Sequence, residues 1–274
     1  NKNMTWVADI ESEWQLYLGN KRSKVKNQVR KILLKENCKK IIPWTHETAN
    51  AIIKEFPEIK NKIEVVYPAV PLIKTKNKKH KKINLLFVAR YFEAKGGSEA
   101  LEVFDYLTKK YDNINAIVVS DVPEYILKRY SKNKKIKFYG SIPQKKLFEE
   151  IYPISDILVY PGYSDTLGFA YLEAMSFGIP IVTVDGFSRK EIVNEGKTGF
   201  ILKRPEMGRI KKKFFINKRE LLTKEIIEKT EILIKNKGLR EKMSKNGLRE
   251  IRIGKFSIKE QNKKLERIYA EALE

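Results

Sequence analysis

The sequence predicts an α/β fold built on a Rossmann-like parallel sheet, with a second, smaller lobe before it. Short β-branched runs alternate with helix-like segments along most of the chain, which is typical of parallel strands joined by crossover helices. The chain has 274 residues, of which 42% are hydrophobic, so it can bury a core divided between two lobes. A sheet of this kind binds its ligands at the carboxyl ends of its strands.

The larger lobe holds the regular part of this pattern. Its expected strands are 83–89, 115–121, 136–140, 156–161 and 179–185. Helices of a length that fits a crossover are expected at 97–110, 122–131, 144–151, 166–177 and 187–194. From about 219 the chain is helical and polar, and it ends in an amphipathic helix.

The smaller lobe is expected to be an incomplete Rossmann-like unit. Its three expected strands are 5–9, 39–44 and 62–68, separated by a long basic helix over about 11–36 and a shorter one over about 46–56. The Lys-rich segment 73–83 is expected to link the lobes. The expected domains are therefore 1–72 for the smaller lobe, 73–256 for the larger lobe and 257–274 for the C-terminal helix.

The formal net charge is +22, and almost all of it lies in three segments: 21–40, 74–82 and 203–219. A basic balance alone fits nucleic acid, an anionic membrane or an acidic substrate equally. A codon bias toward Lys, Ile and Asn explains the total as well, but it explains the clustering less well. Cys38 is the single cysteine and there are two histidines, so neither an internal disulfide nor a metal site of Cys and His is expected.

The first motif is "SDTLGFAYLEAMSFGIPIVTVD" (164–185), in which Asp165 precedes Glu173 by eight residues. Eight helical residues turn by about 800°, so the two positions face within roughly 80° of each other, about 12 Å apart along the axis. That length suits a nucleotide-sugar. Backbone N–H groups at the expected helix start would attract a phosphate, and they belong to Thr166, Leu167, Gly168 and Phe169.

The two carboxylates are expected at opposite ends of this ligand. Glu173 offers two oxygens to the vicinal diol of a ribose, and Asp165 would hold hydroxyls at the sugar end. Gly168 would let a bulky anion approach the backbone. A structural interpretation stays open beside this one, in which Asp165 caps the helix and Glu173 is a solvated helix residue.

The second motif is "FVARYFEAKGGSEAL" (87–101), which follows the first strand of the larger lobe. It places Arg90 and Lys95 at the carboxyl end of that strand, where ligands are expected, and two cations there indicate an anionic ligand. The alternative is that both are exposed loop charges.

Together, "FVARYFEAKGG" and "FYGSIPQKKLFEEIYPISDILVYPGYSDTLGFAYLEAMSFGIPIVTVD" resemble the donor-binding half of a retaining glycosyltransferase of GT-B fold and family GT4. The resemblance covers roughly 40–274 and is strong over 83–200. The acidic pair of that family falls on Asp165 and Glu173, although Glu is the common residue at the first position. Its diphosphate-binding cations fall on Arg90 and Lys95.

The resemblance implies further features of the site and the reaction. Residues 138–144, with Gly140, would line the nucleobase, and residues 184–193 would border the sugar pocket with no single residue singled out. The implied activity is retaining transfer of a sugar from a UDP-, GDP- or ADP-sugar to a glycan or lipid-linked acceptor. Neither a metal nor a cofactor is expected, because cations and a helix start would stabilise the leaving diphosphate.

The family also binds its acceptor in an N-terminal lobe that opens with a Gly-rich loop, and residues before 40 contain no such loop. We therefore expect either a part of a longer protein or a reduced lobe, with the helix 257–274 crossing back to it. The expected location is cytoplasmic, with segments 21–40 and 203–219 on an anionic membrane surface. The alternatives are a nucleotide-sugar epimerase of GT-B shape and a basic nucleic-acid-binding protein, although no specific nucleic-acid partner is expected.

Overall fold

The computed structural model describes residues 4–20, 22–72, 81–210 and 213–274, and it describes side chains within these ranges except at 209–216. Most of the expected linker 73–83 lies outside the described residues. The chain forms two compact units, and each is described by itself. One unit runs up to Val70 and includes Ile251–Glu274, and the other is Pro71–Glu250. The boundaries expected from the sequence were 72 and 256.

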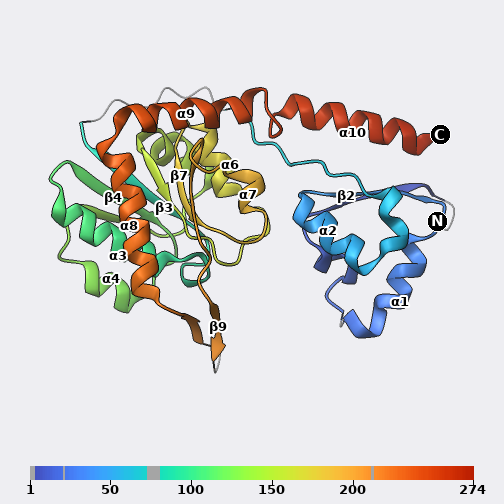
Figure 1. Cartoon of the computed structure of the whole chain (residues 1–274), viewed down its shortest axis with the longest axis horizontal. Helices are drawn as coiled ribbons and strands as arrows, with labels where there is room; N and C mark the ends of the chain where they lie inside the picture. Colours follow the sequence, from blue (N-terminus) through green and yellow to red (C-terminus); the bar gives the residue numbers. More distant parts are fainter. Residues whose placement is uncertain (1–3, 21, 73–80, 211–212) are drawn as a thin grey trace. The chain divides into compact units, whose positions relative to one another are not determined.

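The larger unit is built on a six-stranded sheet in which every neighbouring pair is parallel (Figure 1). From edge to edge the strands are β5 (Ile136–Tyr139), β4 (Ile114–Val119), β3 (Ile83–Val88), β6 (Ile157–Val159), β7 (Ile181–Val184) and β8 (Gly199–Leu202). The chain starts in the middle at β3, proceeds to one edge, and returns to β6 to build the other half. The order therefore reverses between β3 and β6, where the crevice for a ligand is expected.

The strands form because continuous apolar runs are buried on both faces. In β3, the side chains of Leu85, Leu86 and Phe87 are fully buried. The helices of this unit are α3 (Gly97–Lys110), α4 (Glu124–Tyr130), α5 (Gln144–Lys146), α6 (Phe169–Ser176), α7 (Arg189–Ile192), α8 (Arg219–Lys235) and α9 (Lys237–Arg252), with a π turn at Leu147–Ile151. Helix α8 packs against α3 and against β6, β7 and β8 (Figure 1).

The structure differs from the expected pattern at one edge of this unit. The sixth strand, β8, was not expected from the sequence. The basic segment 203–219 contains an antiparallel pair of short strands, β9 (Met207–Ile210) and β10 (Lys213–Ile216), which lead directly into α8. The membrane-binding role expected for this segment depends mainly on the side chains of 209–216, which the structure does not describe.

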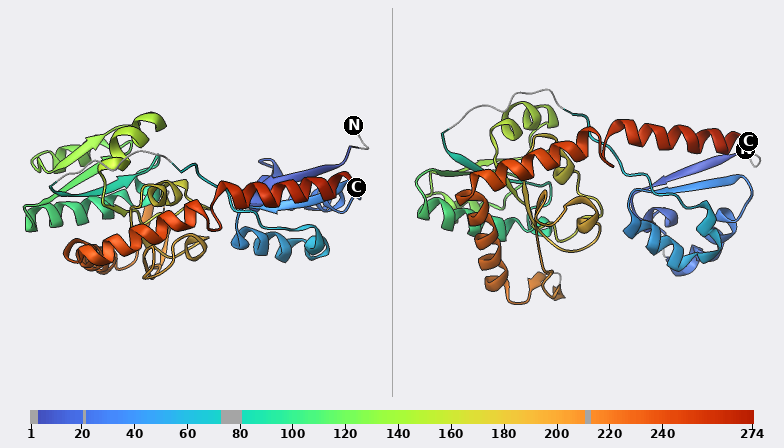
Figure 2. Two further views of the ribbon diagram at one scale, coloured as in Figure 1. Left: turned by 90° about the horizontal axis from the view of Figure 1, so that it is seen from above. Right: turned by 45° about the horizontal axis from the view of Figure 1, so that its top comes forward.

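The smaller unit contains a two-stranded parallel sheet of β1 (Trp6–Ile10) and β2 (Cys38–Pro43). One face carries a core with α1 (Arg22–Leu33), α2 (His46–Glu55) and a 3₁₀ helix at Pro57–Lys62. On the other face, Ile42 packs with Val66 and with Ile268 of α10 (Ile258–Leu273). Helix α10 contacts both β1 and β2 and runs alongside them in Figure 2. Successive side chains of a strand point to opposite faces of the sheet, so both faces of this two-stranded sheet carry buried side chains.

The expectation of one long helix over 11–36 is wrong. Residues Glu13–Tyr17 form a 3₁₀ helix, and α1 begins only at Arg22. The backbone leaves the helical region at Leu18 and Gly19, whose φ angles are 48° and 78°. Glycine adopts this left-handed conformation at little cost, so the Leu-Gly pair ends the first helix.

The third strand expected at 62–68 is also wrong. The segment runs beside β2, but it forms only an isolated bridge between Ile63 and Ile41, with hydrogen bonds from the N–H groups of Glu64 and Val66 to β2 carbonyls. The ladder cannot continue because Pro43 of β2 and Pro68 have no N–H group to donate.

The basic charge of α1 is partly neutralised within its own unit. Arg22 and Lys26 both pair with Glu55 of α2, whose side chain is only 4% exposed. Arg30 pairs with Glu58 at 3.1 Å. Although burial alone would raise the pKa of Glu55, the hydrogen bond from Arg22 holds that pKa below its usual value. Within the described ranges, no helix is both long and apolar enough to cross a bilayer.

Candidate functional site

Two loops meet where the strand order reverses, after β3 and after β6. The N–H group of Gly162 donates to the carbonyl oxygen of Lys95 at 2.9 Å and ties the loops together. Gly96 has a φ of 80°, and a Cβ atom there would lie 2.5 Å from Cβ of Pro161. A side chain at residue 96 would therefore separate the loops. The glycine allows Lys95 to lie directly against the loop after β6.

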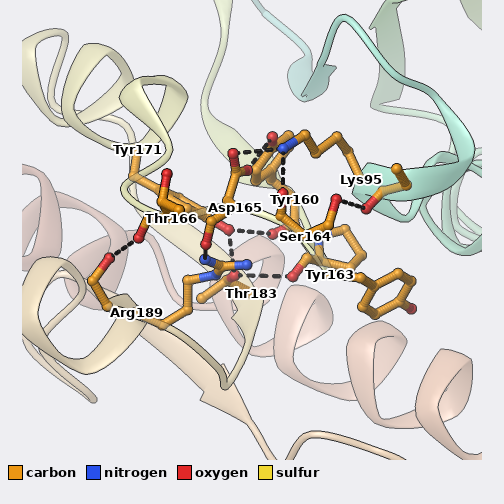
Figure 3. A network of polar contacts seen from close by, with 12 residues as sticks. Lys95, Tyr160, Tyr163, Ser164, Asp165, Thr166, Tyr171, Thr183 and Arg189 are labelled. Atoms are coloured by element: carbon orange, nitrogen blue, oxygen red, sulfur yellow. Dashed lines mark hydrogen bonds and ion pairs between the residues drawn. The ribbon is translucent and has the colours of Figure 1, made fainter. Parts of the chain in front are cut away.

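Lys95 and Asp165, which the sequence predicted for this site, lie together in the structure (Figure 3). The Nζ atom of Lys95 is 2.6 Å from Oδ1 of Asp165 and 2.8 Å from the carbonyl oxygen of Ser164. The hydroxyl of Tyr160 donates to Oδ2 of Asp165 at 2.5 Å. Burial, and then the Asp165 charge, raises the pKa of Tyr160 well above its usual value. Tyr160 is therefore a protonated donor at neutral pH.

Arg90 lies two residues beyond the end of β3, and its side chain is exposed. Its guanidinium stands over the ring of the adjacent Tyr91, 5.5 Å from the centroid. Within the described parts of the chain, Arg90 has neither a hydrogen bond nor an ion pair. The structure does not join it to Lys95 and Asp165, and it leaves a cation at the strand end that is free to bind an anion.

Glu173 lies on α6 and is held by two polar side chains of its own. The Tyr152 hydroxyl donates to Oε2 of Glu173 at 2.8 Å, and Nε2 of Gln144 donates to Oε1 at 3.1 Å. Tyr152 is buried, and its ring stacks on that of Phe177 with the centroids 5.1 Å apart. Burial, and then Glu173, raises the pKa of Tyr152 well above its usual value. The structure shows no contact between Glu173 and Asp165.

The helix expected to start at 166 starts at Phe169, so Thr166 and Leu167 precede its first turn. The cause is Gly168, which has a φ of 80°, and a Cβ atom there would lie 2.6 Å from Cε2 of Tyr171. The side chain of Leu167 is fully buried. In the structure Thr166 and Leu167 lie before the helix start, and the phosphate-binding role expected for the N–H groups of 166–169 stays a prediction.

Gly140 follows β5 and is exposed, and a Cβ atom there would meet nothing within 4 Å. No interaction found in the structure joins Gly140 to Lys95, Asp165 or Glu173. Its role beside a nucleobase stays a prediction.

Sequence reasoning missed Arg189, the largest of the fully buried side chains. Its NH1 group donates to the carbonyl oxygen of Asp165 at 2.8 Å (Figure 3). The hydroxyl of Ser188 donates to the carbonyl oxygen of Thr166. The sequence did indicate that the segment 184–193 borders the site. It did not single out Arg189, because an Arg followed by a Lys at the start of a short helix is typical of two solvent-exposed side chains.

The site carries more positive than negative charge. Lys95, Arg189 and Arg204 all donate to the loop after β6. Burial, and then the charge of Arg189, lowers the pKa of Arg204. Asp165 lies among these cations, and Asp185 pairs with a further lysine at 2.6 Å. An anionic ligand would relieve this imbalance.

The described part of the chain holds no cluster of three or more His, Cys, Asp or Glu side chains that could bind a metal ion. The carboxylates found in the site are occupied by lysine, tyrosine or glutamine donors instead.

Comparison with known proteins identifies relatives of this chain. The family described as glycosyl transferases group 1 matches residues 71–250. An uncharacterised glycosyltransferase of Haemophilus influenzae is 31% identical over 174 residues, covering 62% of this chain and 49% of the relative. The capsular polysaccharide biosynthesis glycosyltransferase CapM of Staphylococcus aureus is 24% identical over 208 residues, covering 72% and 49%. The chain thus spans about half the length of these curated relatives.

Solved structures show the same fold. A glycosyltransferase from Rickettsia africae ESF-5 matches 98% of this chain and 70% of its own, with a TM-score of 0.74 and 17% identity. Anabaena HepE, solved with UDP and glucose, matches 97% of this chain and 71% of its own, with a TM-score of 0.71 and 13% identity. The predicted GT-B fold is confirmed. With the family matched over the whole larger unit, the chain belongs to the glycosyl transferases group 1 family.

Proposed function

We propose that this protein is a retaining, metal-independent glycosyltransferase that uses a nucleoside-diphosphate sugar as donor. The observation that carries the proposal is the Lys95–Asp165 pair, which lies where the strand order reverses and just before α6, the helix that contains Glu173. The family of the larger unit supports it, and so does the UDP complex of a structural neighbour. The relatives reported above favour neither an epimerase nor a nucleic-acid-binding protein.

Lys95 has a clear chemical task in this proposal. Negative charge grows on the diphosphate as the sugar leaves, and a cation fixed beside it lowers the barrier. At an effective dielectric constant of ~20, a unit charge pair at 4 Å is worth about 4 kcal/mol, or roughly a thousandfold in rate if it forms only in the transition state. Arg90, whose exposed guanidinium has no ion pair within the described residues, adds a second cation.

Binding of a diphosphate would rearrange the Lys95–Asp165 pair. The Lys95 ammonium has three N–H donors, and two of them are directed at Asp165 and at the Ser164 carbonyl. A diphosphate that draws Lys95 toward itself frees Oδ1 of Asp165 to accept a sugar hydroxyl. Asp165 is shorter than the Glu common at this position in the family, so the hydroxyl must come close to the loop.

In the proposed mechanism the acceptor attacks the same face of the sugar that the diphosphate leaves, so the configuration is retained. The bond between the anomeric carbon and the diphosphate oxygen breaks, and a bond from the acceptor oxygen to that carbon forms. The departing phosphate oxygen takes the acceptor proton, so the charges balance without a carboxylate nucleophile. Glu173 contributes by binding the two hydroxyls of the ribose. Of its present partners, Gln144, at 3.1 Å, is the one that these hydroxyls would displace more readily.

Thermal-shift screening against UDP, GDP and ADP, and then against their glucose derivatives, tests the donor class, because a ligand of the folded state raises the melting temperature. Mass spectrometry of reactions with and without an added glycan then tests the transfer. We expect a product heavier by one sugar only with acceptor present. An epimer of the donor has the same mass, so it is sought by proton NMR, and its formation without any acceptor would indicate the epimerase instead.

For the acceptor, we propose a glycan or a lipid-linked sugar at an anionic membrane. The smaller unit supports this with large apolar side chains exposed near basic residues. Trp14 is 63% exposed and Leu18 is 87% exposed, and Ile32 and Leu34 are also exposed at the end of basic α1. Such a combination binds the interface of an anionic bilayer. The proposed location is therefore the cytoplasmic face of a membrane, with peripheral attachment.

Sedimentation with anionic liposomes at low salt tests this attachment. The wild type should sediment with the vesicles, and the double variant Trp14→Ser/Leu18→Ser should remain mostly in the supernatant. A control variant, Tyr125→Ser, removes an aromatic side chain that is 69% exposed in the larger unit, and it should sediment like the wild type. Equal recovery of the wild type with and without vesicles would contradict the proposal.

A further inference from the structure

The loop after β6 is held in place through its carbonyl groups. Four successive carbonyl oxygens, those of residues 163–166, each accept a hydrogen bond from a side chain outside the loop. The donors, in the order of the carbonyls, are Arg204, Lys95, Arg189 and Ser188. Three of the four donors are cations, so the loop depends on charged hydrogen bonds, which are stronger than neutral ones.

Arg189 differs from the other donors because its side chain is completely buried. No carboxylate within the described residues lies within ion-pair distance of it, and its Nε and NH2 groups have no hydrogen-bond partner there. Aromatic rings replace the missing counter-ion. The guanidinium carbon lies 5.4 Å from the ring centroid of Tyr171 and 5.7 Å from that of Phe187. A buried guanidinium without a carboxylate is costly, so this arrangement indicates a specific role.

The surrounding residues make room for Arg189. Gly162 has a φ of 64°, and a Cβ atom there would lie 3.0 Å from NH2 of Arg189 and 2.2 Å from the hydroxyl of Tyr171. That Tyr171 hydroxyl lies 3.0 Å from Oγ1 of Thr183 on β7. The position of Arg189 is therefore fixed from the sheet, from α6 and from the loop itself, and Figure 3 shows the guanidinium beneath Asp165.

We propose that Arg189 is a positioning residue for Asp165. Its NH1 group fixes the main-chain carbonyl of Asp165, and this sets the direction in which the carboxylate leaves the backbone toward Lys95 and Tyr160. Arg189 itself touches no ligand, because it has no exposed surface. The consequence for sugar binding rests on the proposed function, whereas the effect on the loop does not.

Amide hydrogen exchange measured by mass spectrometry tests the effect on the loop without any ligand. In Arg189→Met, exchange within 162–166 should rise about tenfold or more, most clearly at the Gly162 N–H that bonds to Lys95, because the loop loses a charged hydrogen bond, while exchange in β7 changes little. Arg189→Lys keeps a charge but not the planar fork, and it should give a smaller rise. Lys190→Met is the control, because Lys190 is next to Arg189 in the sequence but its side chain is 73% exposed. It should leave amide exchange in the loop unchanged.

Ligand binding tests whether Arg189 acts through Asp165. The probes are UDP, GDP and ADP, and their glucose derivatives. With the nucleotide that binds best, Arg189→Met should weaken the sugar-bearing form several-fold more than the bare diphosphate. In an Asp165→Ala background, the same substitution should cause no further loss, because the residue that it positions is gone.

The outcomes separate this proposal from the proposed function. If none of the probes binds the wild type, the proposed function fails, and the exchange experiment still decides the role of Arg189. Unchanged loop exchange in both Arg189 variants would overturn the positioning role, and so would an equal rise throughout the larger unit, which marks a general loss of stability. If Arg189→Met does not fold, Arg189→Lys alone decides by the same criteria.

Discussion

The Nζ atom of Lys95 lies 2.6 Å from Oδ1 of Asp165, and this ion pair joins two loops that are 70 residues apart in the sequence. Both side chains are mostly buried, with 13% and 14% of their surfaces exposed. The pair stands where the strand order reverses, which is where a parallel α/β sheet binds its ligand. It therefore connects the fold of the larger unit to its proposed chemistry.

Replacing Lys95 by Met should weaken binding of the nucleoside diphosphate by about 10- to 100-fold, because one of the cations for the phosphates is lost. Isothermal titration calorimetry measures this directly. Lys109→Met is a matched control on the far part of α3, where the lysine is 68% exposed and paired with Asp105, and its affinity should equal that of the wild type. Equal affinities for both variants would remove Lys95 from the binding site.

Tyr152 should act on binding through Glu173. Tyr152→Phe deletes the donor that lies 2.8 Å from Oε2 of Glu173, so we expect the affinity for the diphosphate to fall about 3- to 10-fold, which is the net contribution of one typical hydrogen bond. In a Glu173→Ala background the same change should have no effect. A loss of the same size in both backgrounds would show that Tyr152 acts through core packing alone.

Because of Tyr160, the unfolding free energy should depend on pH in the alkaline range. Its pKa in the folded protein is raised well above 10.0, so its contribution is complete below pH 10 and is lost as the pH rises from there through the raised pKa. The difference in unfolding free energy between the wild type and Tyr160→Phe should be constant from pH 7 to about 9 and shrink above about 10. Denaturant unfolding at each pH measures it. A difference that stays constant up to pH 11 would contradict the assignment.

The two carboxylates that pair with α1 should contribute differently to stability. Glu55 is nearly buried and pairs with Arg22 and Lys26, so Glu55→Gln should cost about 1–3 kcal/mol of unfolding free energy. Glu58→Gln breaks a pair in which both side chains are 40% exposed, and it should cost less than about 1 kcal/mol. Urea unfolding of both variants checks this order, and equal losses would show that burial does not strengthen the Glu55 pair.

The sequence predicts the larger unit well because its strands are buried on both faces and therefore appear as apolar runs. Five of the six strands of the sheet overlap the expected ranges. The sixth strand, β8, begins at Gly199 directly after a turn, so only three apolar residues mark it. In the smaller unit the errors arose at Leu18 and Pro68, where the backbone conformation and a missing N–H group override an otherwise regular pattern.

The candidate site was predictable where residue types carry the chemistry. Asp165 and Lys95 are charged residues in the loops that follow β6 and β3, and they lie together in the structure. Arg189 was not predictable, because nothing in "SRKEI" distinguishes a buried guanidinium from a solvated one. The start of α6 was misplaced for a local reason, since Gly168 adopts the left-handed conformation before the helix begins.

A crystal structure of this chain with the nucleoside diphosphate selected by the thermal-shift screen tests the central claim most directly. We predict diphosphate oxygens within hydrogen-bond distance of Nζ of Lys95, ribose hydroxyls on the carboxylate of Glu173, and a Lys95–Asp165 pair that has opened to release Oδ1. A nucleotide bound elsewhere on the protein, with both side chains left in their present contacts, would contradict this claim.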